Sequence, residues 1–231
     1  MNQAAEEPSR PRGADLRHVE TWLFDLDNTL YPRESGLGAL MEPRITAFVM
    51  EATGLPRDQA YALQKRYLAE EGLTLRGLMT HHGSDPDAYH ARFHDLPLDG
   101  LDRDEPLRAA LARLPGRRLI FTNADAVHAE RVVDRLGLAG LFDDIFHIGS
   151  AAFAPKPSAR AFARIVAAHA IAPKATAFFE DAERNLAPAA ALGITTVLVG
   201  AHAAASTAPF VDFRTERLAP FLAAAAIKEP P

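Results

Sequence analysis

The stretch 19-VETWLFDLDNTL-30 decides the fold of this chain. Its first half is short, apolar and rich in β-branched and aromatic residues, which is typical of a strand buried on both faces of a parallel sheet. Its second half turns abruptly polar, with Asp25, Asp27 and Asn28 in close succession. In open parallel sheets, ligands bind beyond the carboxyl ends of the strands. The stretch therefore predicts a strand at residues 19–25 that delivers carboxylates to a functional site.

Four more apolar, β-rich runs follow along the chain, and helical segments alternate with them. The predicted strands are residues 118–122, 144–148, 175–180 and 195–199, and the predicted helices are residues 126–136, 158–170 and 186–192. Strands and helices that alternate at intervals of roughly thirty residues form βαβ units. We therefore predict an α/β fold with a parallel sheet.

The first interval is different, because about ninety residues separate the first two predicted strands, roughly three times a βαβ unit. This segment has almost no β-rich run and several groups of apolar residues at helical spacing. An all-helical cap inserted after the first strand is the simplest account. We place a disordered tail at residues 1–17, the cap at 36–99, and the core at 18–35 and 100–231.

The composition limits the chemistry that the protein can use. The 231 residues include no cysteine and carry a formal net charge of -5. Disulfide scaffolds, thiol nucleophiles and thiolate zinc sites are thereby excluded. The mild acidity offers no basic surface for nucleic-acid phosphates, so we expect no nucleic-acid polymer as a partner. No run approaches the roughly 20 apolar residues of a membrane span, so we expect a cytoplasmic protein that does not enter a membrane.

Polar side chains gather where three of the predicted strands end, and a loop that contains a lysine follows the predicted strand at residues 144–148. These residues are Asp25 and Asp27, Thr122 and Asn123, Glu180 and Asp181, and Lys156. Converging carboxylates repel one another, and a hard divalent cation with oxygen ligands, best matched by magnesium, would compensate them. Such a site suits phosphate. One carboxylate can attack phosphorus, and a second can protonate the leaving oxygen and later deprotonate water.

Each of these residues also has a structural interpretation. Asp25 and Thr122 could cap helices, and Lys156, which lies between two prolines, could be an exposed turn lysine. Only the ordered set favours chemistry. The cap histidines His90 and His94 have a spacing that can bind zinc, but nothing supplies a third ligand at a fixed spacing, so we interpret them as packed or solvated.

In order and spacing, the set resembles the four motifs of the haloacid dehalogenase superfamily. The resemblance implies a Rossmann-like core with a cap inserted after the first motif (a C1 cap). It also implies that Asp25 is the nucleophile and that Asp27 is the acid and base. The implied phosphate contacts are Thr122, Asn123 and Lys156; the implied Mg²⁺ ligands are Asp25, the main-chain carbonyl of Asp27, and Asp181. Strand alternation points Glu180 away from Asp181, so we expect Glu180 to orient a metal-bound water.

Residues 24–32 and the cap segments 72–78 and 93–98 resemble the pyrimidine 5′-nucleotidase subgroup. The resemblance implies a small-molecule phosphate ester as substrate, namely a nucleoside monophosphate. Leu73 stands where this subgroup is expected to have a small polar residue, which leaves the fine substrate preference open.

Three other classes of protein have to be weighed. A sugar-phosphate phosphatase or phosphomutase shares the four core motifs. A dehalogenase has no need of the acid that Asp27 provides. A non-enzymatic phospho-accepting receiver or binding module also gathers acids and a lysine at strand ends, but receivers place the acceptor on the third strand and lack a cap of this length. The sequence leaves the oligomeric state unknown.

Overall fold

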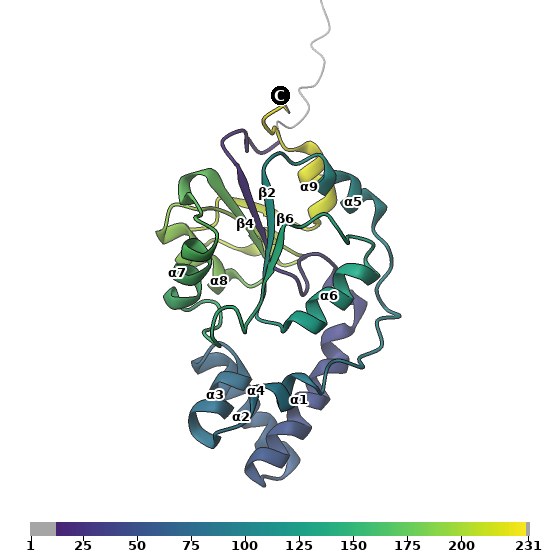
Figure 1. Ribbon diagram of the computed structural model, residues 1–231, viewed down its shortest axis with the longest axis vertical. Coiled ribbons are helices and arrows are strands. Elements are labelled where there is room, and N and C mark those ends of the chain that lie inside the picture. The colour runs from purple at the N-terminus through teal and green to yellow at the C-terminus, as the bar shows by residue number, and fades with distance from the viewer. Residues whose placement is uncertain (1–12, 230–231) are drawn as a thin grey trace, which may run out of the picture.

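The computed structural model describes residues 13–229 and contains a six-stranded parallel sheet between two layers of helices (Figure 1). The strand order is β3-β2-β1-β4-β5-β6, and every neighbouring pair is parallel. The strands are β1 (Thr21–Phe24), β2 (Arg117–Phe121), β3 (Asp144–Phe146), β4 (Thr176–Glu180), β5 (Thr195–Val199) and β6 (Phe213–Thr215). The predicted α/β, Rossmann-like fold is confirmed.

All five predicted strands are present, and β6 is a sixth strand that was not predicted. This strand has only three residues, each half-buried, and it lies at the edge of the sheet, where it pairs with β5 alone. A strand of this kind needs no continuous apolar run, because one side of it has no neighbouring strand. The pattern used for the central strands therefore could not detect it.

Each face of the sheet is covered by its own helices (Figure 1). Helices α7 (Ala159–Ala168) and α8 (Glu183–Ala191) cover one face, and α5 (Glu105–Ala112), α6 (Ala126–Arg135) and α9 (Leu218–Ala224) cover the other. Strand residues alternate between the two cores, since Leu23 belongs to the α7–α8 side while Trp22 and Phe24 belong to the α5–α6–α9 side. Within residues 13–229, no helix has both the length and the apolar character that a membrane span requires.

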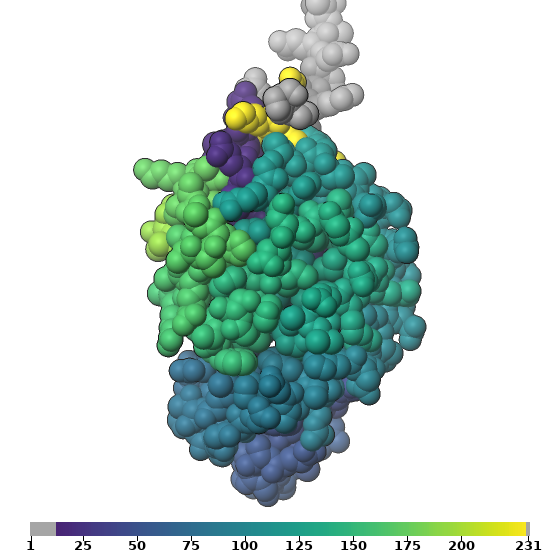
Figure 2. Space-filling model, in the orientation of Figure 1, coloured from purple at the N-terminus to yellow at the C-terminus, as the bar shows by residue number. Residues whose placement is uncertain are grey.

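The long insertion between β1 and β2 is helical, as its apolar spacing predicted. Helices α1 (Leu37–Thr53), α2 (Arg57–Glu70), α3 (Thr74–His82) and α4 (Pro86–His90) lie together beyond the carboxyl ends of the strands (Figure 1). Packing of α2 on α3 requires a glycine, because a Cβ at Gly77 would lie 2.2 Å from the Tyr67 ring. On the face shown in Figure 2, this helical group is seated directly against the core. Residues 36–99 remain our proposed limits for the cap.

The N-terminal segment is more ordered than the sequence suggested. Residues 1–12 of the predicted tail lie outside the described residues, but residues 13–17 pack against the core. The Leu16 side chain is fully buried, and the Leu16 backbone N–H donates to the carbonyl of Ala226 at 2.8 Å. One apolar residue in a polar segment has no periodicity, so this anchoring gave no signal in the sequence.

Candidate active site

The candidate site lies where the strand order reverses. From β1 the chain builds outward through β2 and β3 on one side, and it then crosses to β4, β5 and β6 on the other. Such a switch point between two adjacent parallel strands is where ligands bind in open α/β sheets. The register pairs Phe24 with Phe179, and the N–H of Asp25 donates to the Phe179 carbonyl at 2.9 Å. Asp25 therefore emerges from the sheet beside Glu180 and Asp181.

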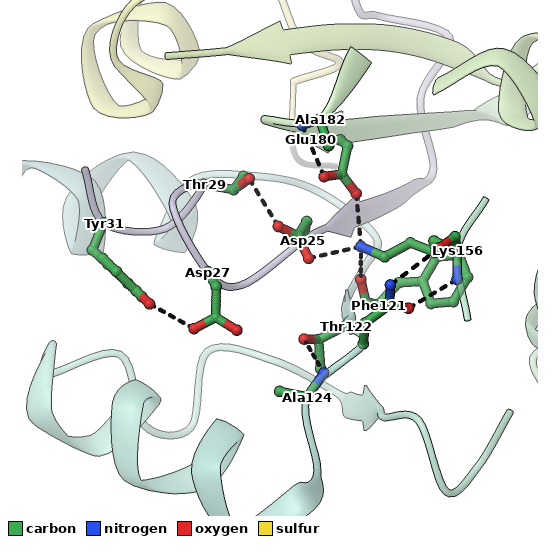
Figure 3. A network of polar contacts seen from close by, with 11 residues as sticks. Asp25, Asp27, Thr29, Tyr31, Phe121, Thr122, Ala124, Lys156, Glu180 and Ala182 are labelled. Carbon is green, nitrogen blue, oxygen red and sulfur yellow. Dashed lines mark hydrogen bonds and ion pairs between the residues drawn. The ribbon is translucent and has the colours of Figure 1, made fainter. Parts of the chain in front are cut away.

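Lys156 crosses the switch point and ties its two sides together (Figure 3). Its Nζ donates to Asp25 Oδ1, Glu180 Oε2 and the Phe121 carbonyl, each at 2.7 Å. The side chain is 1% exposed, so these three bonds satisfy all three donors of a buried ammonium group. A phosphate contact from Lys156 would have to share one of these hydrogens, and the phosphate-binding role stays a prediction.

Negative charge exceeds positive charge around this lysine. Burial, followed by the Glu180 carboxylate, raises the pKa of Asp25 to about 7, although Lys156 acts against the rise. Burial, followed by the Asp25 carboxylate, raises the pKa of Asp181 to about 6. One oxygen from each of Asp25, Glu180 and Asp181 lies within 4.8 Å of the others. An oxygen-only cluster with surplus negative charge fits a hard divalent cation such as Mg²⁺.

The two carboxylates at the end of β4 have different surroundings. Glu180 is fully buried and both of its oxygens are used, Oε2 by Lys156 and Oε1 by the N–H of Ala182 at 3.1 Å. Asp181 is only half-buried, and its carbonyl accepts from His202 Nε2 at 2.8 Å. We therefore keep Asp181 as the proposed metal ligand from this strand end and Glu180 as the residue that holds Lys156.

Asp27 is held apart from the lysine network by two donors of its own. Its Oδ1 lies 2.5 Å from the Tyr31 hydroxyl and 2.9 Å from His128 Nε2 (Tyr31 is drawn in Figure 3). Burial acts to raise the pKa of Asp27, but the His128 and Tyr31 contacts outweigh it and lower the pKa below its usual value. Asn28, with φ of 65°, makes the tight turn that places Asp27 here.

Two hydroxyl groups lie near Asp25 (Figure 3). The Thr122 hydroxyl oxygen accepts from the N–H of Ala124 at 3.0 Å, so it can still donate its hydrogen to a phosphate oxygen. The Thr29 hydroxyl donates to Asp25 Oδ2 at 3.2 Å. Together with Lys156 on Oδ1, this bond fixes the orientation of the Asp25 carboxylate.

The Asn123 side chain binds the backbone of Lys156. Its Oδ1 accepts from the Lys156 N–H at 2.8 Å, and its Nδ2 donates to the Lys156 carbonyl at 3.2 Å. The side chain thus braces the backbone of the lysine loop, a contact between residues 33 positions apart that sequence spacing could not reveal. A phosphate contact at Asn123, implied by the resemblance, stays a prediction.

Sequence reasoning also gave no role to Thr29, Tyr31 and His128. Thr29 and Tyr31 each lie four residues beyond the aspartate that they contact. This spacing predicts a contact only if the segment after β1 is known to turn. His128 lies 101 residues from Asp27 and reaches it only because α6 packs beside the end of β1. Nothing in the local sequence marks that contact.

The two cap histidines meet a core carboxylate. His90 Nδ1 lies 3.2 Å from Asp125 Oδ2, and His94 Nε2 lies 3.4 Å from Asp125 Oδ1. Across residues 13–229, the one cluster of three ligating side chains is Asp25, Glu180 and Asp181. His90 is buried and His94 is partly exposed, so one is packed and the other is in contact with solvent.

Comparison with known proteins supplies the family. Residues 19–193 match the haloacid dehalogenase-like hydrolase family. Phosphate metabolism protein 8 of Saccharomyces cerevisiae is 31% identical over 214 residues, which cover 86% of this chain and 66% of the yeast protein. This chain thus spans only 66% of that relative's length.

Solved structures with this fold include different kinds of enzyme. A phosphatase of the same superfamily from Thermococcus onnurineus has a TM-score of 0.58 at 16% identity, over 86% of this chain and 94% of the other. L-2-haloacid dehalogenase from Xanthobacter autotrophicus has a TM-score of 0.54 at 17% identity, over 89% and 97%. At such identities the likeness concerns the fold alone. The sequence match over residues 19–193 and the strand-end cluster that it contains lead to one conclusion: the chain belongs to the haloacid dehalogenase-like hydrolase family.

Proposed function

We propose that this protein is a magnesium-dependent phosphomonoesterase of the cytoplasm that hydrolyses a nucleoside monophosphate through a phospho-aspartate at Asp25. The observation that carries the proposal is the arrangement at the switch point. A buried, oriented carboxylate lies against a buried lysine and within 4.8 Å of two further carboxylates. Asp27, two residues on, provides a second carboxylate in a different electrostatic environment.

The reaction has two halves. An Asp25 oxygen attacks phosphorus, the bond from phosphorus to the leaving oxygen breaks, and Asp27 gives that oxygen a proton. Water then attacks the aspartyl phosphate, Asp27 takes a proton from the water, and inorganic phosphate leaves with Asp25 restored. The Thr122 hydroxyl and the Lys156 ammonium are the proposed donors to the non-bridging oxygens.

The proposed Mg²⁺ ligands are the carboxylates of Asp25 and Asp181 and the main-chain carbonyl of Asp27. Bound there, the cation would neutralise the surplus negative charge of the site and that of the phosphate. The donor set supports this choice, because Mg²⁺ prefers oxygen ligands and these residues offer only oxygens.

Asp27 supports phosphate ester chemistry over dehalogenation. The fold alone does not choose, since a phosphatase and a dehalogenase share it with this chain. An ester oxygen needs a proton when it leaves, whereas a halide does not. A carboxylate held by two hydrogen bonds at this position is therefore an argument for an oxygen leaving group.

The nucleoside monophosphate is the finer part of the proposal. It depends on the resemblance of the cap segments at residues 72–78 and 93–98 to the pyrimidine 5′-nucleotidase subgroup. The name of the yeast relative refers only to phosphate metabolism. A sugar-phosphate phosphatase or phosphomutase is the competing function with the same core chemistry.

A phosphate-release screen across nucleoside monophosphates and sugar phosphates, with Mg²⁺ or with EDTA, tests the proposal. We expect release that requires Mg²⁺ and that favours UMP and CMP. A preference for sugar phosphates would contradict the nucleotidase assignment, and a requirement for a bisphosphate activator would indicate a phosphomutase. No release from any ester, together with a phosphoprotein that lasts for minutes, would indicate a receiver and refute the phosphatase.

A further inference from the structure

His128 is a buried polar residue whose contacts inside the core are incomplete. The residue is 1% exposed, its Nε2 lies 2.9 Å from Asp27 Oδ1, and its Nδ1 has no hydrogen-bond partner within residues 13–229. Burying a polar atom without a partner costs free energy. Packing alone therefore does not explain a histidine at this position. The one polar contact of its ring is with Asp27, the proposed acid and base.

The geometry of that contact distinguishes the two oxygens of Asp27. A carboxylate oxygen only accepts hydrogen bonds, so His128 Nε2 carries the hydrogen and donates it. The Tyr31 hydroxyl donates to the same oxygen, Oδ1, at 2.5 Å. These two donors occupy the lone pairs of Oδ1 and fix rotation of the carboxylate, which leaves Oδ2 as the oxygen able to exchange a proton.

We propose that His128 is a positioning residue, which holds Asp27 Oδ1 so that Oδ2 faces the leaving group. The inference rests on the proposed phosphatase function and adds a residue that none of the four motifs contains. The general acid then depends on a helix outside the motifs, because α6 carries His128.

Helix α6 is held at two places, at its start beside Asp27 and where it contacts the cap. Asp125 caps its first turn and accepts the His128 N–H at 3.0 Å, which sets the start of the helix beside Asp27. The same Asp125 faces His90 of the cap, and Arg131 donates to the carbonyl of Leu96 at 2.8 Å. The side chain that orients the acid is therefore mounted on the helix to which the cap is attached.

A pair of variants tests the role by leaving-group dependence. His128→Gln keeps an N–H donor near the position of Nε2, whereas the shorter His128→Asn cannot reach Asp27. We expect His128→Asn to lower kcat/KM about 100-fold for a nucleoside monophosphate or alkyl phosphate, whose alkoxide must be protonated. For p-nitrophenyl phosphate, whose leaving group needs little protonation, the loss should be under about 5-fold. His128→Gln should recover activity to within about 10-fold of the wild type.

The outcomes separate positioning from packing. Equal losses on the two substrates, equal losses in the Gln and Asn variants, or no loss at all would overturn the proposal. If the His128 variants do not fold, Tyr31→Phe removes the other donor to Oδ1 and must show the same leaving-group dependence. Failure of the proposed function itself is visible separately, as wild-type protein that releases no phosphate from any ester.

Discussion

The strand-end cluster and the cap contacts are built on different kinds of interaction. At the switch point, buried charged side chains bond to one another at 2.7 Å, and parallel strands in register set their positions. The cap shares buried apolar residues with the core, and its polar contacts with the core include the His90–Asp125 pair and long side chains that reach backbone carbonyls. Arg131 and Arg135 of α6 bind the carbonyls of Leu96 and Leu98.

This difference indicates which part can move. The residues at the strand ends cannot shift without breaking the sheet ladder or exposing a buried charge. No strand pairing joins the cap to the sheet, and the arginine contacts between α6 and the cap are single hydrogen bonds, which break and re-form at lower cost. Changes in the cluster should therefore alter catalysis and stability, and changes in the cap contacts should alter substrate binding.

The largest expected effect comes from Asp25→Asn. If the cluster carries out the chemistry, loss of the nucleophile should lower phosphate release at least about 10⁴-fold while the circular dichroism spectrum stays that of the wild type. Asp134→Asn, an exposed change on α6, is the matched control and should keep full activity. Activity of Asp25→Asn within about tenfold of the wild type would refute the mechanism.

The next effect is on stability. Lys156→Met leaves Asp25 and Glu180 buried without their cation, so the free energy of unfolding in EDTA should fall by about 3 to 5 kcal/mol. The double variant Lys156→Met/Glu180→Gln should recover part of that loss, because it removes one of the two buried carboxylate charges that have lost their partner. Urea denaturation measures both variants.

The exposed Lys174→Met serves as the control for this measurement and should change the free energy of unfolding by less than about 0.5 kcal/mol. If the free energy of unfolding of Lys156→Met fell by less than about 1 kcal/mol, or if the double variant showed no recovery, the sheet and not the charge network would fix the cluster.

The strand-end residues were predictable for the same reason that they are rigid. Parallel strands deliver their carboxyl ends to one edge, so the change from apolar to polar residues at Asp25, Thr122 and Glu180 predicted that these side chains would lie together. The loop residue Lys156 needed only to follow a strand of the same sheet. Order along the chain was enough in each case.

What escaped prediction depends on angles between elements. His128 reaches Asp27 through the packing of α6, and Asn123 braces Lys156 across a loop. Spacing along the chain carries no information about either contact, because each joins residues far apart in sequence through one orientation of a side chain. The edge strand β6 and the buried Leu16 escaped for a related reason, since each is too short to show a period.

A smaller effect is expected where the cap meets the start of α6. Burial acts to raise the pKa of Asp125, but the hydrogen bond from His90 and the N–H of His128 outweigh it and lower the pKa to about 2. Asp125→Asn keeps a good N-cap and loses the charge, at a cost of about 1 kcal/mol near pH 7. Because the folded pKa is depressed from 3.8, this contribution is present above pH 3.8 and disappears as the pH falls toward 2.

Urea titrations of the wild type and Asp125→Asn at several pH values measure that difference directly. A gap in stability that is constant from pH 7 to below 3 would show that the carboxylate charge contributes nothing at this contact. The KM should rise in the variant with kcat nearly unchanged, since His90 and His94 lose their charged partner.

The smallest effect should come from Arg135→Gln, which removes the 3.1 Å bond to the Leu98 carbonyl on the segment returning from the cap. An exposed bond of this kind contributes only about 0.5 to 1 kcal/mol, so we expect KM to rise about 2- to 4-fold with kcat unchanged. Arg113→Gln is the matched control, because Arg113 also donates to a carbonyl, that of Ala223 at 2.6 Å, but within the core. A cap held by separable contacts predicts a KM change for Arg135→Gln alone. If kcat fell instead, the attachment of the cap to α6 would be part of the catalytic arrangement. Helix α6 would then belong with the movable cap and not with the rigid core.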